Sequence, residues 1–281
     1  MGNKHLVMLS QDKELPPVFI IPGAGGLSND YYELALELQN NYCVYCPEMY
    51  GTLRGEVPLE TISDIAALNI KWIKEVQPEG PYRLIGHSFG AYPAFEMARQ
   101  LEQAGDEIVF TAILDEYATL HCLIDENAHI NALKLAADYL RDFDIIRHPF
   151  PEWFLALADE LYDLPLKQLA GKIAGLLKEH LPEKSEDIDF TTSLINLRIY
   201  NAHMSYHPAA KLQGELIVFR SAQNEEHEAG AMGWAPFGES VEIIELQDGH
   251  GMRGNENARI IAGQILLKDI SITPSTPGRN G

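Results

Sequence analysis

The chain has 281 residues, of which 46% are hydrophobic and 22% charged, and this composition suits a folded domain with a sizeable core. Its formal net charge at pH 7 is −20. An electrostatic field of that sign repels phosphate groups, so we expect neither nucleic-acid binding nor docking to an anionic membrane.

The three cysteines do not make a disulfide framework, and no second pair of ligands completes a zinc site around Cys43 and Cys46. Both thiols fall in an apolar run, so we expect them in the core. No stretch approaches the roughly 18 uninterrupted apolar residues of a membrane span. The first residues also lack the long apolar run of a signal peptide. We therefore expect a cytoplasmic protein without a metal site.

Strand-like and helix-like patterns alternate along the first 116 residues. Short apolar, β-branched runs predict strands, and apolar residues at intervals of three and four predict helices. In chain order we expect a strand and glycine-rich turn in 16–26, a helix over 31–41, a strand over 42–48, a helix over 62–77, a strand over 82–88, a helix over 90–105 and a strand over 107–116. This alternation predicts an α/β protein with a mostly parallel sheet and helices on both faces.

The pattern changes after residue 116, where only helical stretches follow for about a hundred residues. Strand-like runs return at 214–221 and 240–249, and a helical pattern over 256–270 closes the fold. We therefore predict one α/β domain with a helical insertion. Its expected parts are a first core segment over 1–116, a helical lid over 117–213, a second core segment over 214–270 and a flexible tail over 271–281.

The sequence GHSFG, residues 86–90, places a serine between two glycines at the turn from a predicted strand into a predicted helix. In a G-x-S-x-G turn the serine adopts a strained backbone conformation. Glycine at positions 86 and 90 avoids side-chain clashes across the turn, so that Ser88 is presented at the carboxyl edge of the sheet. Ser88 is therefore the candidate nucleophile of a serine hydrolase.

A histidine must take the proton of the serine hydroxyl, and in this architecture it follows the acid in the chain. His250 fits best, because it lies between the last predicted strand and the final helix, on a loop that can reach Ser88. His87 adjoins the serine, but we expect its side chain to leave the turn in another direction.

Asp115 ends the strand predicted over 107–116 and is the candidate acid that orients His250. Many proteins of this architecture carry the acid after the next-to-last strand instead. Here that position offers only glutamates, from Glu225 on, several residues past the strand. Glu116 is the nearest alternative to Asp115.

The oxyanion that forms during acyl transfer needs two backbone N–H donors. We expect one from Phe89, the residue after the nucleophile. The other should come from the glycine-rich turn over 22–26, with Ala24 as the first choice and Gly23 as the second.

The segment QPEGPYRLIGHSFGAYPAFEMARQLEQAGDEIVFTAILDE closely resembles the core of thioesterase domains from modular polyketide and nonribosomal peptide synthetases. The resemblance extends to VFIIPGAGG before it, and to LIVFRSAQ and DGHGMRG after it. It implies an α/β-hydrolase fold with a variable helical lid. It also implies that Ser88, Asp115 and His250 form the catalytic triad. The acid on the earlier strand favours the type fused to a synthetase over the free-standing editing type.

The resemblance further implies an acyl substrate on the phosphopantetheine arm of an acyl or peptidyl carrier protein, with no other cofactor. Water would release the acyl chain from Ser88 as a free acid, or an internal nucleophile would release it as a ring. The lid residues Trp153, Phe154, Leu157 and Tyr162 would line the acyl channel or pack against the core. We also expect a local docking patch for the carrier protein, formed by lysines such as Lys172 and Lys178.

Two rival functions remain open at this point. A general carboxylesterase or lipase would use the same triad and differ only in the leaving group of its substrate. A non-catalytic binding protein of this fold is the other rival, although such proteins usually lose the serine or the histidine.

Overall fold

The computed structural model describes residues 3–53, 56, 58–118, 179, 202, 206–221, 230–247, 249 and 255–272. Its strands are β1 (Leu6–Met8), β2 (Pro17–Ile21), β3 (Cys43–Pro47), β4 (Tyr82–His87), β5 (Ile108–Leu114), β6 (Glu215–Ser221) and β7 (Val241–Leu246). They form one sheet in the order β1-β3-β2-β4-β5-β6-β7. Only β1 runs antiparallel to its neighbour among these strands, so the predicted, mostly parallel sheet is confirmed.

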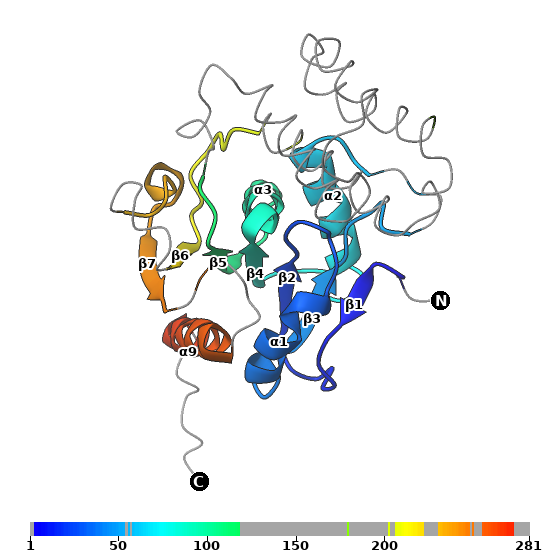
Figure 1. The fold of residues 1–281 in the computed structure, drawn as a ribbon. Helices are drawn as coiled ribbons and strands as arrows, with labels where there is room; N and C mark the ends of the chain where they lie inside the picture. Colours follow the sequence, from blue (N-terminus) through cyan, green and yellow to red (C-terminus); the bar gives the residue numbers. More distant parts are fainter. Residues whose placement is uncertain are drawn as a thin grey trace, which may run out of the picture.

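Helices cover both faces of the sheet, as Figure 1 shows. The described helices are α1 (Tyr32–Leu38), α2 (Ile62–Ile73), α3 (Ala91–Gln103) and α9 (Asn255–Ile272), with short 3-10 helices η1 (Asn29–Tyr31), η2 (Ser88–Gly90) and η6 (Ala235–Phe237). Helices α2 and α3 lie on one face, and α1 and α9 lie on the other. The core accordingly has two parts, one on each side of the sheet.

Strand β2 is buried on both faces of the sheet, which explains its continuous apolar sequence. Phe19 and Ile21 pack toward α2 and α3, whereas Val18 and Ile20 pack toward α1 and α9. A central parallel strand that is buried on both faces has no solvent side and therefore no polar alternation. Cys43 lies in a strand of the same sheet, and its thiol is buried and free, as expected.

Each strand and helix predicted in the two core segments is present, with ends that differ by a few residues. Strand β1 was not predicted, because its three partly exposed residues are too few to show a periodic pattern. Helix α9 reaches Ile272, past the boundary expected at residue 270. Most of the predicted lid, residues 119–178, 180–201 and 203–205, lies outside the described residues.

The order of the strands reverses between β2 and β4. The connection from β2 to β3 contains α1 on one face, and the connection from β4 to β5 contains α3 on the opposite face. The loops that follow β2 and β4 therefore leave neighbouring strands in opposite directions. In open α/β sheets this switch point, at the carboxyl ends of the strands, is where ligands bind.

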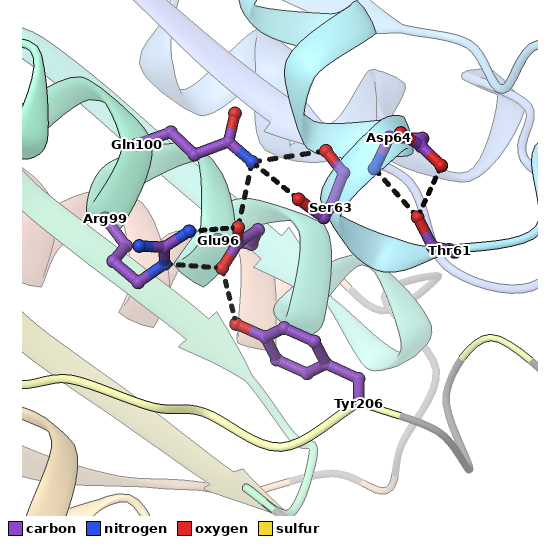
Figure 2. Close-up of polar contacts among 7 residues, drawn as sticks. All are labelled: Thr61, Ser63, Asp64, Glu96, Arg99, Gln100 and Tyr206. Atoms are coloured by element: carbon purple, nitrogen blue, oxygen red, sulfur yellow. Dashed lines mark hydrogen bonds and ion pairs between the residues drawn. The ribbon is translucent and has the colours of Figure 1, made fainter.

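A polar cluster fixes α3 to α2 and to the segment before β6, as Figure 2 shows. Glu96 is 3% exposed and accepts hydrogen bonds from Arg99 at 2.6 and 2.8 Å and from the Tyr206 hydroxyl at 3.0 Å. Gln100 donates to the Ser63 carbonyl at 3.2 Å. Burial alone would raise the pKa of Glu96, but hydrogen bonds from Arg99 and Gln100 and the Arg99 charge lower it below its usual value.

Tyr92, one turn before Glu96 on α3, contacts both chain segments that lead to the predicted lid. Its hydroxyl donates to the Tyr117 carbonyl over 2.7 Å. Its ring lies edge-on to the Tyr206 ring, with 6.2 Å between their centroids. The chain just after β5 and the chain before β6 are thus held by one helix.

Candidate active site

Ser88 lies in a sharp turn between β4 and α3 and has a φ of 50°, in the left-handed region. This conformation costs a non-glycine residue about 1–3 kcal/mol, and such strain is typical of functional sites. Ser88 is half-buried, whereas both of its neighbours in the chain are buried. The turn therefore has the strained conformation that the G-x-S-x-G pattern predicts.

The two glycines of the motif are required by close backbone contacts. A Cβ added to Gly86 would lie 2.5 Å from the Gly90 carbonyl oxygen. A Cβ added to Gly90 would lie 2.2 Å from the carbonyl oxygen of Ile21 and 2.6 Å from that of Pro22. The clash expected across the turn is thus confirmed for Gly86, whereas Gly90 is required because the start of α3 lies directly against the end of β2.

The glycine-rich loop after β2 crosses next to the serine turn. A Cβ added to Gly23 would lie 3.2 Å from the Cβ of Ser88 and 3.2 Å from the His87 carbonyl oxygen. Ala24, the next residue, is exposed. The loop that was expected to supply an oxyanion donor is therefore adjacent to the candidate nucleophile.

The far end of this loop is held by residues that follow β3. The Met49 N–H donates to the Gly26 carbonyl over 2.8 Å, and the Glu48 carboxylate accepts from the Ser28 N–H at 3.0 Å and from its hydroxyl at 2.7 Å. Gly26 has a φ of 69°, and an added Cβ would lie 2.5 Å from the Cβ of Met49. The loop is thus fixed to the sheet at its end as well as at its start.

A buried tyrosine connects the loop to the serine turn. The Gly23 N–H donates to the Tyr31 hydroxyl over 2.7 Å, and the same hydroxyl lies 3.0 Å from Nδ1 of His87. Burial raises the pKa of Tyr31 far above its usual value, so the hydroxyl stays protonated. The His87 side chain points to Tyr31, consistent with the expectation that it is not the base. Because the Gly23 N–H is taken by Tyr31, Ala24 remains the expected second oxyanion donor.

Asp115 follows β5 directly and is 2% exposed. Its N–H donates to the Phe219 carbonyl, and its Oδ1 accepts from the Ser221 N–H, each over 2.8 Å. Its φ is 54°, so it shares the left-handed conformation of Ser88. In the sheet register His87 lies opposite Leu114. Ser88 and Asp115 therefore follow neighbouring strands at the same level.

Glu116, the alternative acid, is held differently. Its carboxylate accepts from the Tyr117 N–H at 3.0 Å, and its carbonyl accepts from the indole N–H of Trp234 at 2.8 Å. Of the two neighbouring acidic residues, Asp115 is thus the one whose side chain accepts a hydrogen bond from the Ser221 N–H at the end of β6.

The structure brings Ser88, Phe89 and the loop with Ala24 together at the switch point, with Asp115 at the end of the next strand. His250 lies outside the described residues, so its contacts stay a prediction. The same holds for Glu225 and for the lid residues Trp153, Phe154, Leu157, Tyr162, Lys172 and Lys178.

Tyr31 was missed in the sequence, because it opens a helical pattern and lies 56 positions before His87. Within the described residues, no three His, Cys, Asp or Glu side chains gather as a metal site would require. None of the helices in this part of the chain has the length and apolar character needed to cross a bilayer.

Residues 16–161 match the family described as "Thioesterase domain". Two synthetases are among the similar proteins. Indigoidine synthase from Streptomyces lavendulae is 47% identical over 92 residues, which cover 33% of this chain and 7% of the synthase. The dimodular nonribosomal peptide synthase from Bacillus subtilis (strain 168) is 32% identical over 194 residues, 63% of this chain and 8% of the synthase. The chain thus matches less than a tenth of the length of either relative.

Among solved structures, the type II thioesterase BorB from the borrelidin biosynthetic cluster has the same fold. It aligns with a TM-score of 0.67 and 19% sequence identity, over 95% of this chain and 98% of its own. Together with the strand order and the serine turn, this likeness confirms the predicted α/β-hydrolase fold.

Proposed function

The chain belongs to the thioesterase domain family, and we propose that it is a serine thioesterase that takes its acyl chain from a carrier-protein phosphopantetheine arm. One observation carries the choice of nucleophile. Ser88 has a φ of 50° in a turn at the switch point, with Gly23 of the glycine-rich loop packed against it. The family and the synthetase relatives support the thioester substrate and the carrier partner.

In the proposed reaction, Ser88 Oγ attacks the thioester carbonyl while His250 takes the hydroxyl proton. The N–H groups of Phe89 and Ala24 stabilise the negative oxygen of the tetrahedral intermediate. The C–S bond then breaks, and the phosphopantetheine sulfur leaves as a thiol with the proton from His250. Asp115 keeps His250 in the required tautomer and stabilises its protonated form.

The second half of the reaction releases the acyl chain from Ser88. Water, or a hydroxyl or amine of the acyl chain itself, attacks the ester carbonyl and gives its proton to His250. The C–O bond to Ser88 breaks, and the proton returns to Ser88 Oγ. A free acid forms with water as the attacking group, and a macrolactone or macrolactam forms with the internal group. This chemistry needs no cofactor beyond the arm of the carrier.

The test compares one acyl chain offered as a pantetheine thioester and as a matched oxygen ester, with wild type and Ser88→Ala. Turnover of the thioester in preference to the ester, abolished in Ser88→Ala at unchanged thermal stability, supports the proposal. Retained turnover in Ser88→Ala would overturn the choice of nucleophile. A Ser88-dependent preference for the oxygen ester would assign the chain to the carboxylesterases instead.

A further inference from the structure

One buried hydroxyl contacts both loops that meet at Ser88. Tyr31 Oη accepts the Gly23 N–H at 2.7 Å, and it lies 3.0 Å from Nδ1 of His87, the residue just before Ser88. Tyr31 is 2% exposed and His87 is 8% exposed, so water competes little for these bonds. The two rings also touch edge to face, with 5.7 Å between their centroids.

We propose that Tyr31 is a positioning residue for the oxyanion donor: through Gly23 it holds the Ala24 N–H in place beside Ser88. This inference rests on the serine chemistry proposed above. Tyr31 touches neither the substrate nor the reacting atoms, and it acts through the backbone of the loop.

The hydrogen bonds are satisfied in one consistent arrangement. A phenol has one hydrogen to donate and lone pairs to accept. In the tautomer of His87 that carries its hydrogen on Nε2, Nδ1 accepts the phenol hydrogen while the Tyr31 oxygen accepts the Gly23 N–H. Removal of the hydroxyl would leave the Gly23 N–H without this buried acceptor and Nδ1 of His87 without this donor, which is unfavourable.

The composition of the glycine-rich loop makes its conformation depend on the hydrogen bond from the Gly23 N–H to Tyr31. Gly23 has no side chain to pack, and Ala24 is exposed, so main-chain contacts must fix this part of the loop. An oxyanion donor acts only when it lies about 2.7–3.1 Å from the oxyanion. A small displacement of Gly23 would therefore weaken the donor at Ala24 without altering Ser88 itself.

The first measurement is the rate at which a small alkyl fluorophosphonate modifies Ser88, followed by mass spectrometry. Ser88 Oγ attacks phosphorus and fluoride leaves, and the phosphoryl oxygen occupies the oxyanion site, so the rate reports nucleophile and oxyanion donors without any acyl specificity. We expect Tyr31→Phe to slow the modification about tenfold, less than the 10²–10³-fold typical for outright loss of a donor. In thioester turnover, kcat should fall and KM should stay nearly constant, since the oxyanion forms only on attack.

The matched control is Tyr42→Phe. Tyr42 is 1% exposed, and its hydroxyl donates to Asp269 over 2.9 Å, away from the serine turn. Tyr31→Phe loses the contacts of its hydroxyl with Gly23 and His87, and Tyr42→Phe loses the bond to Asp269, so both variants should melt at a lower temperature. Only Tyr31→Phe should react more slowly. Equal slowing of the two variants would mean a general structural effect and would overturn the inference.

A second pair of variants tests the hydrogen bond to the turn and serves if Tyr31→Phe fails to fold. His87→Asn can keep an acceptor close to the position of Nδ1, whereas His87→Leu removes it. We expect His87→Asn to react with the fluorophosphonate several-fold faster than His87→Leu, and equal rates would count against the inference.

The outcomes separate this inference from the proposed function. If wild type is not modified at Ser88, the serine chemistry fails and the positioning role fails with it. If wild type is modified and Tyr31→Phe reacts at the same rate, the serine chemistry stands and the role of Tyr31 is wrong.

Discussion

The backbone N–H of Ser221, at the end of β6, donates to Oδ1 of Asp115, at the end of β5, over 2.8 Å. This bond fixes the orientation of the Asp115 carboxylate at the carboxyl edge of the sheet. A carboxylate held in this way can orient an imidazole without moving itself. The last residue of β6 thus helps, through its backbone, to position the proposed acid.

Asp115→Asn should lower acyl transfer about 10⁴-fold, because an amide favours the wrong tautomer of the catalytic histidine. The asparagine oxygen can still accept the Ser221 N–H, so we expect the fold to persist. Single-turnover acylation by an acyl-pantetheine measures the effect. Glu116→Gln is the matched control and should retain most of the activity. A large loss in Glu116→Gln with none in Asp115→Asn would transfer the role of the acid to Glu116.

Gly90→Ala should destabilise the fold by about 3 kcal/mol or prevent folding, because this much overpacking cannot be relieved by side-chain movement. The added Cβ would lie 2.2 Å from the carbonyl oxygen of Ile21, and the next atom that it meets is the carbonyl oxygen of Pro22. Urea unfolding measures the change. An alanine variant with the wild-type midpoint would show that α3 can move away from β2.

Gly263→Ala should have the opposite effect. Gly263 is exposed on α9, and apart from the helix's own backbone no atom of the described residues lies within 4 Å of an added Cβ. Alanine in a helix interior is favoured over glycine by about 1 kcal/mol, so the free energy of unfolding should rise by up to that amount. The same urea titration tests this. A loss of stability would mean that α9 has a contact at this position in solution.

Glu96→Gln should be destabilising at pH 7, by about 1.5–3 kcal/mol, because the buried carboxylate loses its charge-assisted hydrogen bonds. The pKa of Glu96 is lowered in the folded state from its ordinary value of 4.5, chiefly through Arg99 against the opposing effect of burial. The stabilisation is therefore complete above pH 4.5 and is lost as the pH falls through the lowered value.

Urea unfolding at pH 7 and at pH 3 gives the measurement. Wild type and Glu96→Gln should differ at pH 7 and converge as the pH falls. Glu239→Gln, at an exposed position, is the control and should match wild type at both values. A difference for Glu96→Gln that is as large at pH 3 as at pH 7 would show that packing, not charge, explains the cluster.

Features of the fold and of the site could be predicted from the sequence where their physical cause lies in neighbouring residues of the chain. Strands β2 and β5 are buried on both faces and therefore appear as nearly continuous apolar runs. The strained turn at Ser88 could be predicted from five adjacent residues, whereas the close contact of Gly90 with the end of β2 joins positions far apart in the chain. Strand β1 could not be predicted, since three residues at the sheet edge show no period. The same limit applies to Tyr31, because its hydrogen bonds join positions far apart in the chain, and to the bond between Ser221 and Asp115.

The contacts of Tyr92 have a consequence for protein engineering. Its hydroxyl donates to the Tyr117 carbonyl in the chain just after β5, and its ring contacts Tyr206 in the segment that leads to β6, while β5 and β6 pair directly with each other. The chain segments at the two ends of residues 119–205 are thereby attached to the same helix, α3, whatever the sequence between them. Splice sites at Ala118 and Tyr206 would let chimeras exchange residues 119–205 between relatives as one cassette.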